Sequence, residues 1–221
     1  GVTHELNQPM AAIRSLADNA KVFLDRDQKN GARENLAFIS DLVDRMGGIT
    51  SQLKMFARKR PSVLASVPLR RTLAESLLIL DERLRRVGAQ LVQDQGADEI
   101  YVRADRDRLG QVLVNILSNA LDAMEGVENP RLDISVQEGP EGVVLSMRDW
   151  GPGLAPNVQA RIFEPFFTTK LAGSGLGLGL AISERIMRDF GGSLRAENAE
   201  GGGALFTLHL MVGEPALAEV G

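Results

Sequence analysis

Two stretches near the start of the chain carry a heptad repeat, the feature that most limits how this part can fold. In the first, apolar residues recur at alternating steps of four and three, at Leu6, Met10, Ile13, Ala17, Ala20 and Leu24. In the second, apolar or small residues recur likewise at Leu36, Ile39, Val43, Met46, Thr50, Leu53 and Ala57. The polar segment 25–31 between them ends in Asn30-Gly31, which predicts a turn. The repeats therefore predict an all-α antiparallel helical hairpin.

A single hairpin has too little interior to cover both repeats. The side chains of Phe23, Phe38 and Phe56 also need cover. A second copy of the chain would provide it, so we expect residues 4–60 to form a homodimer with a four-helix bundle. In this arrangement His4 lies one position from the heptad seam, on the outside of the bundle.

The periodicity changes after Arg60-Pro61, and residues 63–68 are expected to form a linker. Helices are expected at 70–86, 105–124 and 176–190, and Asp105 can cap the second of them. Strands are expected at 89–94, 101–103, 132–136, 143–147, 193–197 and 204–210. Helices interleaved with antiparallel hairpins indicate an α+β sandwich. The expected division is a hairpin domain at 1–62, the linker, an α+β domain at 69–213 and a tail at 214–221.

Composition excludes several classes of protein. The chain has no cysteine, so disulfides, zinc-thiolate sites and thiol catalysis are excluded. Its 25 Lys and Arg residues against 29 Asp and Glu give a net charge of −4, which argues against nucleic acid as a partner. No apolar run approaches the roughly 20 residues that span a bilayer. We expect a cytoplasmic fragment that does not contact the membrane, cut from a longer parent protein for which a membrane anchor stays open.

The common phosphate-binding signatures are absent. No Gly-Lys pair occurs, which excludes a Walker loop. The glycines at 173, 175, 177 and 179 do not match the dinucleotide fingerprint in any register. The tripeptide Asp189-Phe190-Gly191 lacks the other protein-kinase motifs, so we interpret it as the end of a helix.

Five other motifs occur in order along nearly the whole chain. They are His4-Glu5-Leu6-Asn7-Gln8-Pro9, Asn115-Ile-Leu-Ser-Asn119-Ala-Leu-Asp122, Asp149-Trp-Gly151-Pro-Gly153, the segment 162–170 with Phe163 and Lys170, and Gly173-Ser-Gly175-Leu176-Gly177-Leu-Gly179. They resemble the H, N, first glycine, F and second glycine boxes of the sensor histidine kinases of two-component systems. The first motif resembles in particular the kinases that sense dicarboxylates or oxygen.

The resemblance implies a fold and an activity. The α+β domain would be an ATP-binding domain of the histidine kinase, Hsp90 and gyrase type, with ATP and Mg²⁺ as cofactors. The chain would phosphorylate its own His4 and pass the phosphoryl group to an aspartate of a response regulator receiver domain. Gln8 departs from the Thr or Asn that many relatives use to position a hydrolytic water, so the resemblance does not extend to phosphatase activity.

The N-box residues suit a metal and phosphate site. Asn115 and Asn119 are four residues apart and share one face of the expected helix. Amide oxygens are hard, neutral ligands, which suit a Mg²⁺ ion that keeps several waters. By resemblance Asn119 is the Mg²⁺ ligand, Asn115 supports the phosphates or the metal waters, and Asp122 also contacts the nucleotide.

The first glycine box suits the adenine base. The carboxylate of Asp149 accepts hydrogen bonds, as the exocyclic amine of adenine requires. Gly151 and Gly153 would let the backbone approach the flat base closely. Trp150 departs from the small polar residue expected there, and both stacking near the base and simple packing remain open.

The remaining boxes suit the triphosphate. Backbone N–H groups of a glycine-rich segment that leads into a helix bind phosphate well. The expected nucleotide contacts are Phe163, Thr169, Lys170, Gly173, Gly175, Leu176 and Gly177, with Lys170 reaching the γ-phosphate. Residues 150–176 together are expected to form a mobile lid over ATP.

His4 is the candidate nucleophile, because neutral imidazole can attack phosphorus while its other nitrogen is held by an acceptor. By resemblance Glu5 is that acceptor and the general base. Pro9 cannot donate its N–H to the carbonyl of Glu5, which loosens the helix locally. His209 is expected to be structural.

Two other functions remain open. An ATPase of the gyrase, Hsp90 or MutL type would share the N and glycine boxes but would lack a histidine heading a heptad hairpin. A nucleotide-binding scaffold would relay a conformational change without chemistry. The presence of His4, Asn119, Asp149 and Lys170 argues against the scaffold.

Overall fold

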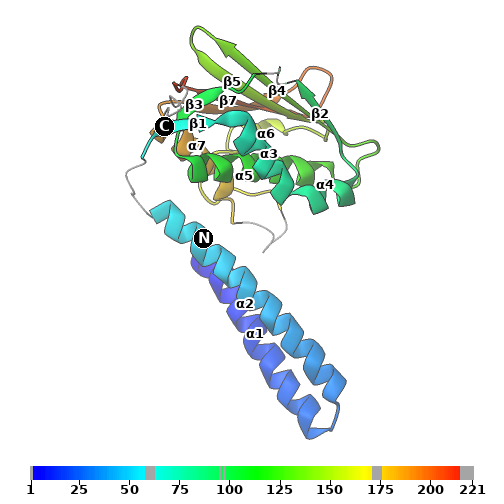
Figure 1. The fold of residues 1–221 in the computed structure, drawn as a ribbon. Coiled ribbons are helices and arrows are strands. Elements are labelled where there is room, and N and C mark those ends of the chain that lie inside the picture. The colour runs from blue at the N-terminus through cyan, green and yellow to red at the C-terminus, as the bar shows by residue number, and fades with distance from the viewer. Residues whose placement is uncertain (1, 58–62, 95, 97, 171–175, 215–221) are drawn as a thin grey trace, which may run out of the picture. The chain divides into compact units, whose positions relative to one another are not determined.

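The computed structural model describes residues 2–57, 63–94, 96, 98–170 and 176–214, and in the two long helices it describes the side chains at 9–43, 46 and 47. The chain divides into two compact units, residues 1–59 with 164–179 and residues 60–163 with 180–221. Figure 1 shows a helical hairpin and a domain of one helical layer against a sheet. None of the helices within these described ranges is both long and apolar enough to cross a membrane.

The hairpin forms as the heptad repeats predict, from α1 (Val2–Asp25) and α2 (Lys29–Ala57). The position of the turn differs from the prediction. The chain reverses at Asp27, which has a φ of 55°, and Gln28 donates its N–H to the carbonyl of Phe23 at 2.8 Å. Asn30 and Gly31, expected in the turn, lie inside α2. A Cβ at Gly31 would lie 3.1 Å from the Phe23 ring, so this glycine permits close packing of the two helices.

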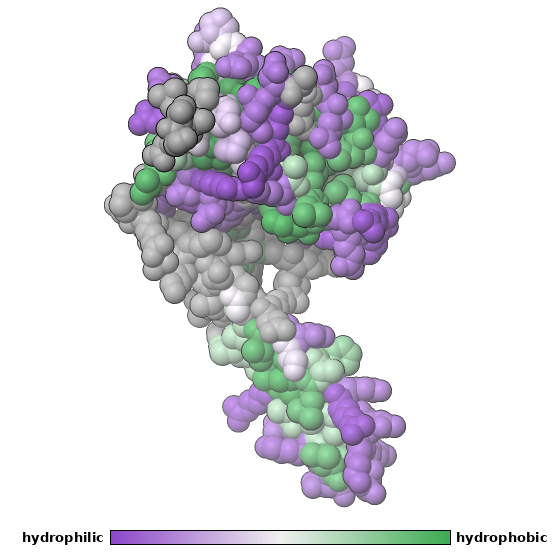
Figure 2. Space-filling view, in the orientation of Figure 1, coloured by the Kyte–Doolittle hydropathy of each residue, from purple (hydrophilic) through white to green (hydrophobic). Residues whose placement is uncertain are grey.

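The heptad residues whose side chains are described fall into two groups, and the side chains of Leu6, Thr50, Leu53 and Ala57 lie outside the described part. Some are buried or half-buried, namely Ile13, Ala17, Ala20, Ile39 and Met46. Others are exposed apolar side chains, namely Met10 (47%), Leu24 (56%), Leu36 (53%) and Val43 (53%). Leu36 and Val43 are two turns apart and share one side of α2. Figure 2 shows hydrophobic residues gathered along the hairpin between hydrophilic ones. One hairpin therefore covers only part of its apolar pattern.

The second unit is the expected α+β sandwich. Its five-stranded sheet has the order β2-β4-β5-β7-β6, formed by β2 (Gln90–Asp94), β4 (Arg131–Gly139), β5 (Gly142–Asp149), β6 (Ser193–Asn198) and β7 (Ala204–Leu210). The pair β2–β4 is parallel, and the other neighbours are antiparallel. Burial alternates along β4 and β5, so one face of the sheet lines the core. That face packs against the helices (Figure 1).

The helices of this unit are α3 (Leu69–Ile79), α4 (Asp81–Val87), α5 (Arg106–Met124), α6 (Pro156–Gln159) and α7 (Gly179–Asp189). The single helix expected at 70–86 is interrupted at Leu80, whose φ of −101° and ψ of 6° are not helical. The prediction that Asp105 caps α5 is confirmed, because its side chain accepts a hydrogen bond from the N–H of Arg108 at 3.2 Å. The last helix begins at Gly179 rather than at residue 176, and the short α6 interrupts the irregular segment.

The linker prediction for 63–68 needs a correction. Residues Ala65–Pro68 form β1, which pairs antiparallel with β3 (Tyr101–Ala104). The second sheet also holds the end of the described chain, because Gly213 donates its N–H to Tyr101 and Ser66 donates its hydroxyl to the carbonyl of Glu214. Four residues that end in proline give a weak strand pattern, and the pairing with β3 is what makes them a strand.

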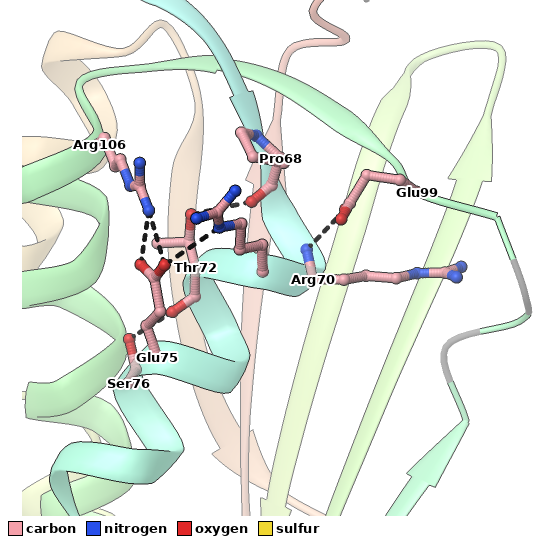
Figure 3. Close-up of polar contacts among 8 residues, drawn as sticks. Pro68, Arg70, Thr72, Glu75, Ser76, Glu99 and Arg106 are labelled. Carbon is pink, nitrogen blue, oxygen red and sulfur yellow. Dashed lines mark hydrogen bonds and ion pairs between the residues drawn. The ribbon is translucent and has the colours of Figure 1, made fainter.

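Polar contacts fix α3 beside α5 (Figure 3). Arg106, at the start of α5, donates to both carboxylate oxygens of Glu75 at 2.6 and 2.8 Å. The hydrogen bond from Arg106 lowers the pKa of Glu75. At the start of α3, the N–H of Arg70 donates to Glu99 at 3.0 Å, and Thr72 donates to the carbonyl of Pro68 at 2.8 Å. The Arg106–Glu75 ion pair joins α3 to α5, and the other two contacts fix the start of α3.

Candidate functional site

The N-box residues lie on one side of α5. The opposite side of this helix is fully buried and consists of Leu109, Val112, Leu113, Ile116, Leu117, Ala120, Leu121 and Met124. Asn115, Ser118, Asn119 and Asp122 are half-buried and lie three or four residues apart. The core therefore fixes the rotation of α5 about its axis and presents Asn115, Asn119 and Asp122 together. The spacing predicted this shared side for Asn115 and Asn119.

The side chain of Asn115 links α5 to α7. Its amide nitrogen donates to the hydroxyl of Ser183 at 3.0 Å, and Ser183 is buried in α7. The second glycine box leads into α7 along the chain. The bond from Asn115 to Ser183 therefore connects the N box with the helix that follows the second glycine box. Asn115 is therefore held in position by a neighbouring helix.

Asp122 forms an ion pair with Arg83 of α4. The same guanidinium donates to the hydroxyl of Ser118 at 2.6 Å, so it lies along the N-box side of α5. Both partners of the ion pair are about three-quarters buried at the side-chain level, which limits screening by water. The sequence did not single out Arg83, because nothing in the local pattern distinguishes it from Arg85 and Arg86.

Asp149 ends β5 and is buried, with 2% of its surface exposed. Its Oδ1 accepts hydrogen bonds from the N–H of Gly151 at 3.0 Å and from the N–H of Ala204 at 3.2 Å. Burial raises the pKa of Asp149, and the backbone hydrogen bonds oppose this shift. Among the described residues Asp149 forms no ion pair. Such a buried carboxylate suits a site that must accept a hydrogen bond from a neutral ligand group.

The glycines of the first glycine box are required by close contacts. A Cβ at Gly151 would lie 2.9 Å from the carbonyl of Ala123 in α5 and from Asp149 Oδ1. Gly153 has a φ of +75°, and a Cβ there would lie 2.7 Å from the side chain of Asn198. Because Ala123 follows Asp122, the contact at Gly151 brings the first glycine box against the end of the N box.

Asn198 holds the turn after Gly153, although the sequence did not point to it. Its Oδ1 accepts from the N–H of Leu154 at 2.6 Å, and its Nδ2 donates to the carbonyl of the same residue at 2.8 Å. Asn198 is the last residue of β6, so the end of that strand fixes the loop that leaves β5. The local sequence gives no sign of this pairing.

Trp150 packs on the outer face of the sheet. Its indole lies 4.0 Å from the guanidinium carbon of Arg148 and 5.1 Å from that of Arg131, measured to the ring centroid. Its Nε1 donates to Asp133 at 2.9 Å. Trp150 therefore packs on these side chains, which is one of the two roles that the sequence left open for it.

The F box and second glycine box are partly described. Phe163 is half-buried and Leu176 is buried, whereas Thr169 and Lys170 are exposed; Gly173 and Gly175 lie outside the described residues. The N–H of Phe166 donates to the carbonyl of Gly177 at 3.0 Å, which joins the two boxes. Gly177 has a φ of +63°, and a Cβ there would lie 2.4 Å from the carbonyl of Phe167. Glycine is therefore required at position 177 by both the backbone angle and the lack of space.

His4 and Glu5 lie in α1, and their side chains and that of Gln8 are outside the described part of the chain. Pro9 lies inside the same helix, one turn beyond Glu5. His209 is exposed on β7. The assignments of His4 as nucleophile and Glu5 as base remain predictions.

Comparison with known proteins identifies the class of this fold. The model of the family described as histidine kinase-, DNA gyrase B-, and HSP90-like ATPase matches residues 104–214. The C4-dicarboxylate transport sensor protein DctB of Pseudomonas aeruginosa is 43% identical over 218 residues, which cover 98% of this chain and 36% of that protein. The DctB of Rhizobium meliloti is 39% identical over 202 residues, covering 91% of this chain and 32% of that protein. The chain thus spans about a third of the length of these relatives.

Solved structures agree with this result. The catalytic domain of histidine kinase ThkA superposes with a TM-score of 0.61 and 30% identity, covering 68% of this chain and 96% of that one. The ThkA kinase in complex with response regulator protein TrrA superposes with a TM-score of 0.74 and 26% identity, covering 95% of this chain and 59% of that one. The second match includes the helical hairpin as well as the α+β domain.

Proposed function

The chain belongs to the sensor histidine kinases of two-component systems, and on this basis we propose that it transfers the γ-phosphoryl group of ATP to its own His4. The observation that carries the proposal is Asp149, a buried carboxylate that ends β5 beside two obligatory glycines. The adenine amine would donate to this carboxylate. The half-buried amides of Asn115 and Asn119 would then face the triphosphate.

A Mg²⁺ ion fits the donors on this side of α5. Asn119 would be its protein ligand, since an amide oxygen is a hard, neutral donor and Mg²⁺ commonly keeps several waters beside phosphate oxygens. The ion would neutralise charge on the phosphates during transfer. Arg83 balances the charge of Asp122 close by, which reduces the repulsion between that carboxylate and a triphosphate.

In the proposed reaction the chain supplies both the nucleophile and the base. The unprotonated imidazole nitrogen of His4 attacks the γ-phosphorus, the bond from that phosphorus to the bridging oxygen breaks, and ADP leaves with the electron pair. Glu5 accepts the proton from the other imidazole nitrogen. Lys170, which is exposed in the F box, would contact the γ-phosphate. The phosphoryl group would pass next to an aspartate carboxylate of a receiver domain, a proposal supported by the ThkA structure solved with a response regulator.

The proposed division of labour follows the two units. The hairpin, within residues 1–62, would serve dimerisation and phosphotransfer, and the α+β domain would bind ATP, with β1 now counted in it. The reaction consumes ATP, so we place this chain in the cytoplasm. The likeness to DctB supports a parent protein that responds to C4-dicarboxylates. Phosphorylation of a longer parent protein that does not change when a C4-dicarboxylate is added would contradict that last assignment.

One labelling experiment separates the three candidate functions. The chain is incubated with Mg²⁺ and ATP labelled in the γ-phosphate. A histidine kinase acquires protein-bound label that is lost in acid and kept in base. An ATPase of the same fold releases labelled phosphate without labelling the protein, and a nucleotide-binding scaffold does neither. We expect the first result, and either of the others would overturn the proposal.

The dimer proposal rests on the exposed heptad residues, and it gives a second test. Val43→Glu places a charge among side chains that a partner hairpin would cover, so we expect the wild-type chain to be a dimer and this variant to be a monomer by light scattering. Ala37→Glu, at an exposed position of the same helix outside the repeat, should remain dimeric. A wild-type chain that is monomeric at micromolar concentrations would contradict the proposal.

A further inference from the structure

Four side chains form a connected cluster on the outer face of the sheet, behind Asp149. Asp133 and Arg148 are direct neighbours across the β4–β5 pair. Asp133 accepts from Arg131 at 2.6 Å and from the Trp150 indole at 2.9 Å, and Arg148 stacks on the same indole. The N–H of Trp150 also donates to the carbonyl of Arg131 at 3.0 Å. The two residues on either side of Asp149 are therefore fixed to the neighbouring strand.

Arg148 also reaches the turn between β6 and β7. Its Nη2 donates to the carbonyls of Glu200 at 2.9 Å and Gly202 at 2.8 Å. This turn contains three consecutive glycines with positive φ, at +84°, +107° and +79° for positions 201 to 203. A glycine-rich turn loses much conformational entropy when it becomes ordered. The two charge-assisted hydrogen bonds from Arg148 to its carbonyls offset this cost and stabilise the observed conformation of the turn.

The far end of the same turn orients Asp149. Ala204 supplies one of the two N–H groups that bond to Asp149 Oδ1, at 3.2 Å. Gly203 packs so tightly on the main chain of Asp149 that a Cβ would lie 1.8 Å from its carbonyl oxygen. The position of the turn therefore determines where the N–H of Ala204, which donates to the carboxylate of Asp149, lies.

Trp150 keeps the guanidinium of Arg148 in this position. The Nε of Arg148 is buried and has no hydrogen-bond partner among the residues that the structure describes, and the indole face lies 4.0 Å from the guanidinium carbon. Stacking of a guanidinium on an aromatic face is favourable and leaves its terminal nitrogens free to donate in the plane. A small residue at position 150 would remove this support and expose the guanidinium to water.

We propose that Arg148, supported by Trp150, is a positioning residue for base recognition, which holds the β6–β7 turn so that Asp149 faces the adenine amine. This inference rests on the proposed function, because it requires that Asp149 contacts the base. Arg148 itself lies on the opposite side of the strand from Asp149 and does not touch the nucleotide. Its effect should therefore depend on the amine of the base and not on the triphosphate.

The test compares binding of ATP with binding of inosine triphosphate, which has the same ribose and triphosphate but a carbonyl in place of the adenine amine. Arg148→Met keeps the apolar length of the side chain and removes both hydrogen bonds to the turn. We expect its affinity for ATP to fall by about threefold to tenfold, the effect of weakening one hydrogen bond, with its affinity for inosine triphosphate unchanged. Arg195→Met, at an exposed position on β6, should behave as wild type.

An equal loss for both nucleotides, or no loss for either, would overturn the positioning role of Arg148. Asp149→Asn is measured in parallel, because a wild-type chain without preference for ATP and an unaffected Asp149→Asn variant would refute the base site itself. If Arg148→Met does not fold, Arg148→Lys replaces it and should narrow the ATP preference to a smaller extent; an unchanged preference in a folded Arg148→Lys variant would also count against the proposal.

Discussion

Asn119→Ala is expected to lower autophosphorylation with Mg²⁺ and ATP by about 100-fold or more, the scale on which loss of one preorganised group that stabilises transition-state charge acts. An alanine side chain offers no oxygen to the metal, and phosphoryl transfer depends almost entirely on positioning and charge neutralisation. Asn119 lies on the side of α5 opposite the buried residues, so truncating it removes no core side chain.

The control for this variant is Gln111→Ala, which removes another half-buried amide from the same helix. It should label at nearly the wild-type rate. Thermal unfolding of both variants, followed by circular dichroism, checks that α5 is intact. A folded Asn119→Ala chain that labels at the rate of wild type would remove Asn119 from the metal site.

Asp149→Asn is expected to weaken ATP binding by about 10- to 100-fold, because a hydrogen bond to a charged group contributes about 1.5–3 kcal/mol. The amide oxygen of asparagine can still accept from the N–H groups of Gly151 and Ala204, which preserves the local fold. The amide nitrogen would then face the adenine amine, donor against donor. Calorimetric titration with ATP measures the loss.

The raised pKa of Asp149 predicts how the Asp149→Asn substitution affects the stability of the fold, apart from its effect on ATP binding. Burial raises the pKa of Asp149 in the folded chain above that in the unfolded chain. The stability that protonated Asp149 contributes to the fold is therefore present at low pH and is lost as the pH rises through the raised pKa. Asp149→Asn removes this loss, so at neutral pH the variant should be no less stable than wild type. Unchanged ATP affinity in the variant would show that Asp149 is not in the base site.

The sequence predicted the parts of this chain that are set by local spacing. The heptad repeats predicted α1 and α2, and the side chain of Asp105 predicted the start of α5. The spacing of Asn115 and Asn119 placed both on one side of their helix because the buried positions between them fix its rotation. In each case the determining residues lie within a few turns of one another.

Features that depend on distant partners could not be predicted in this way. Arg83 reaches a residue 39 positions away, and Ala204 donates to one 55 positions away. Asn30-Gly31 gave the usual signal of a turn, but the glycine is used for packing against Phe23 within the hairpin. These roles become visible only when the helices and strands are placed together.

We propose that His4 receives the phosphoryl group, and the two histidines of this chain allow a direct measurement. His4→Gln and His209→Gln are each incubated with Mg²⁺ and γ-labelled ATP, and the acid-labile, base-stable label on the protein is counted. His209 is exposed on β7, so it is a matched control for the loss of one imidazole. We predict that His4→Gln carries no such label and still binds ATP, whereas His209→Gln is labelled like wild type. Acid-labile label that persists on His4→Gln would contradict the account.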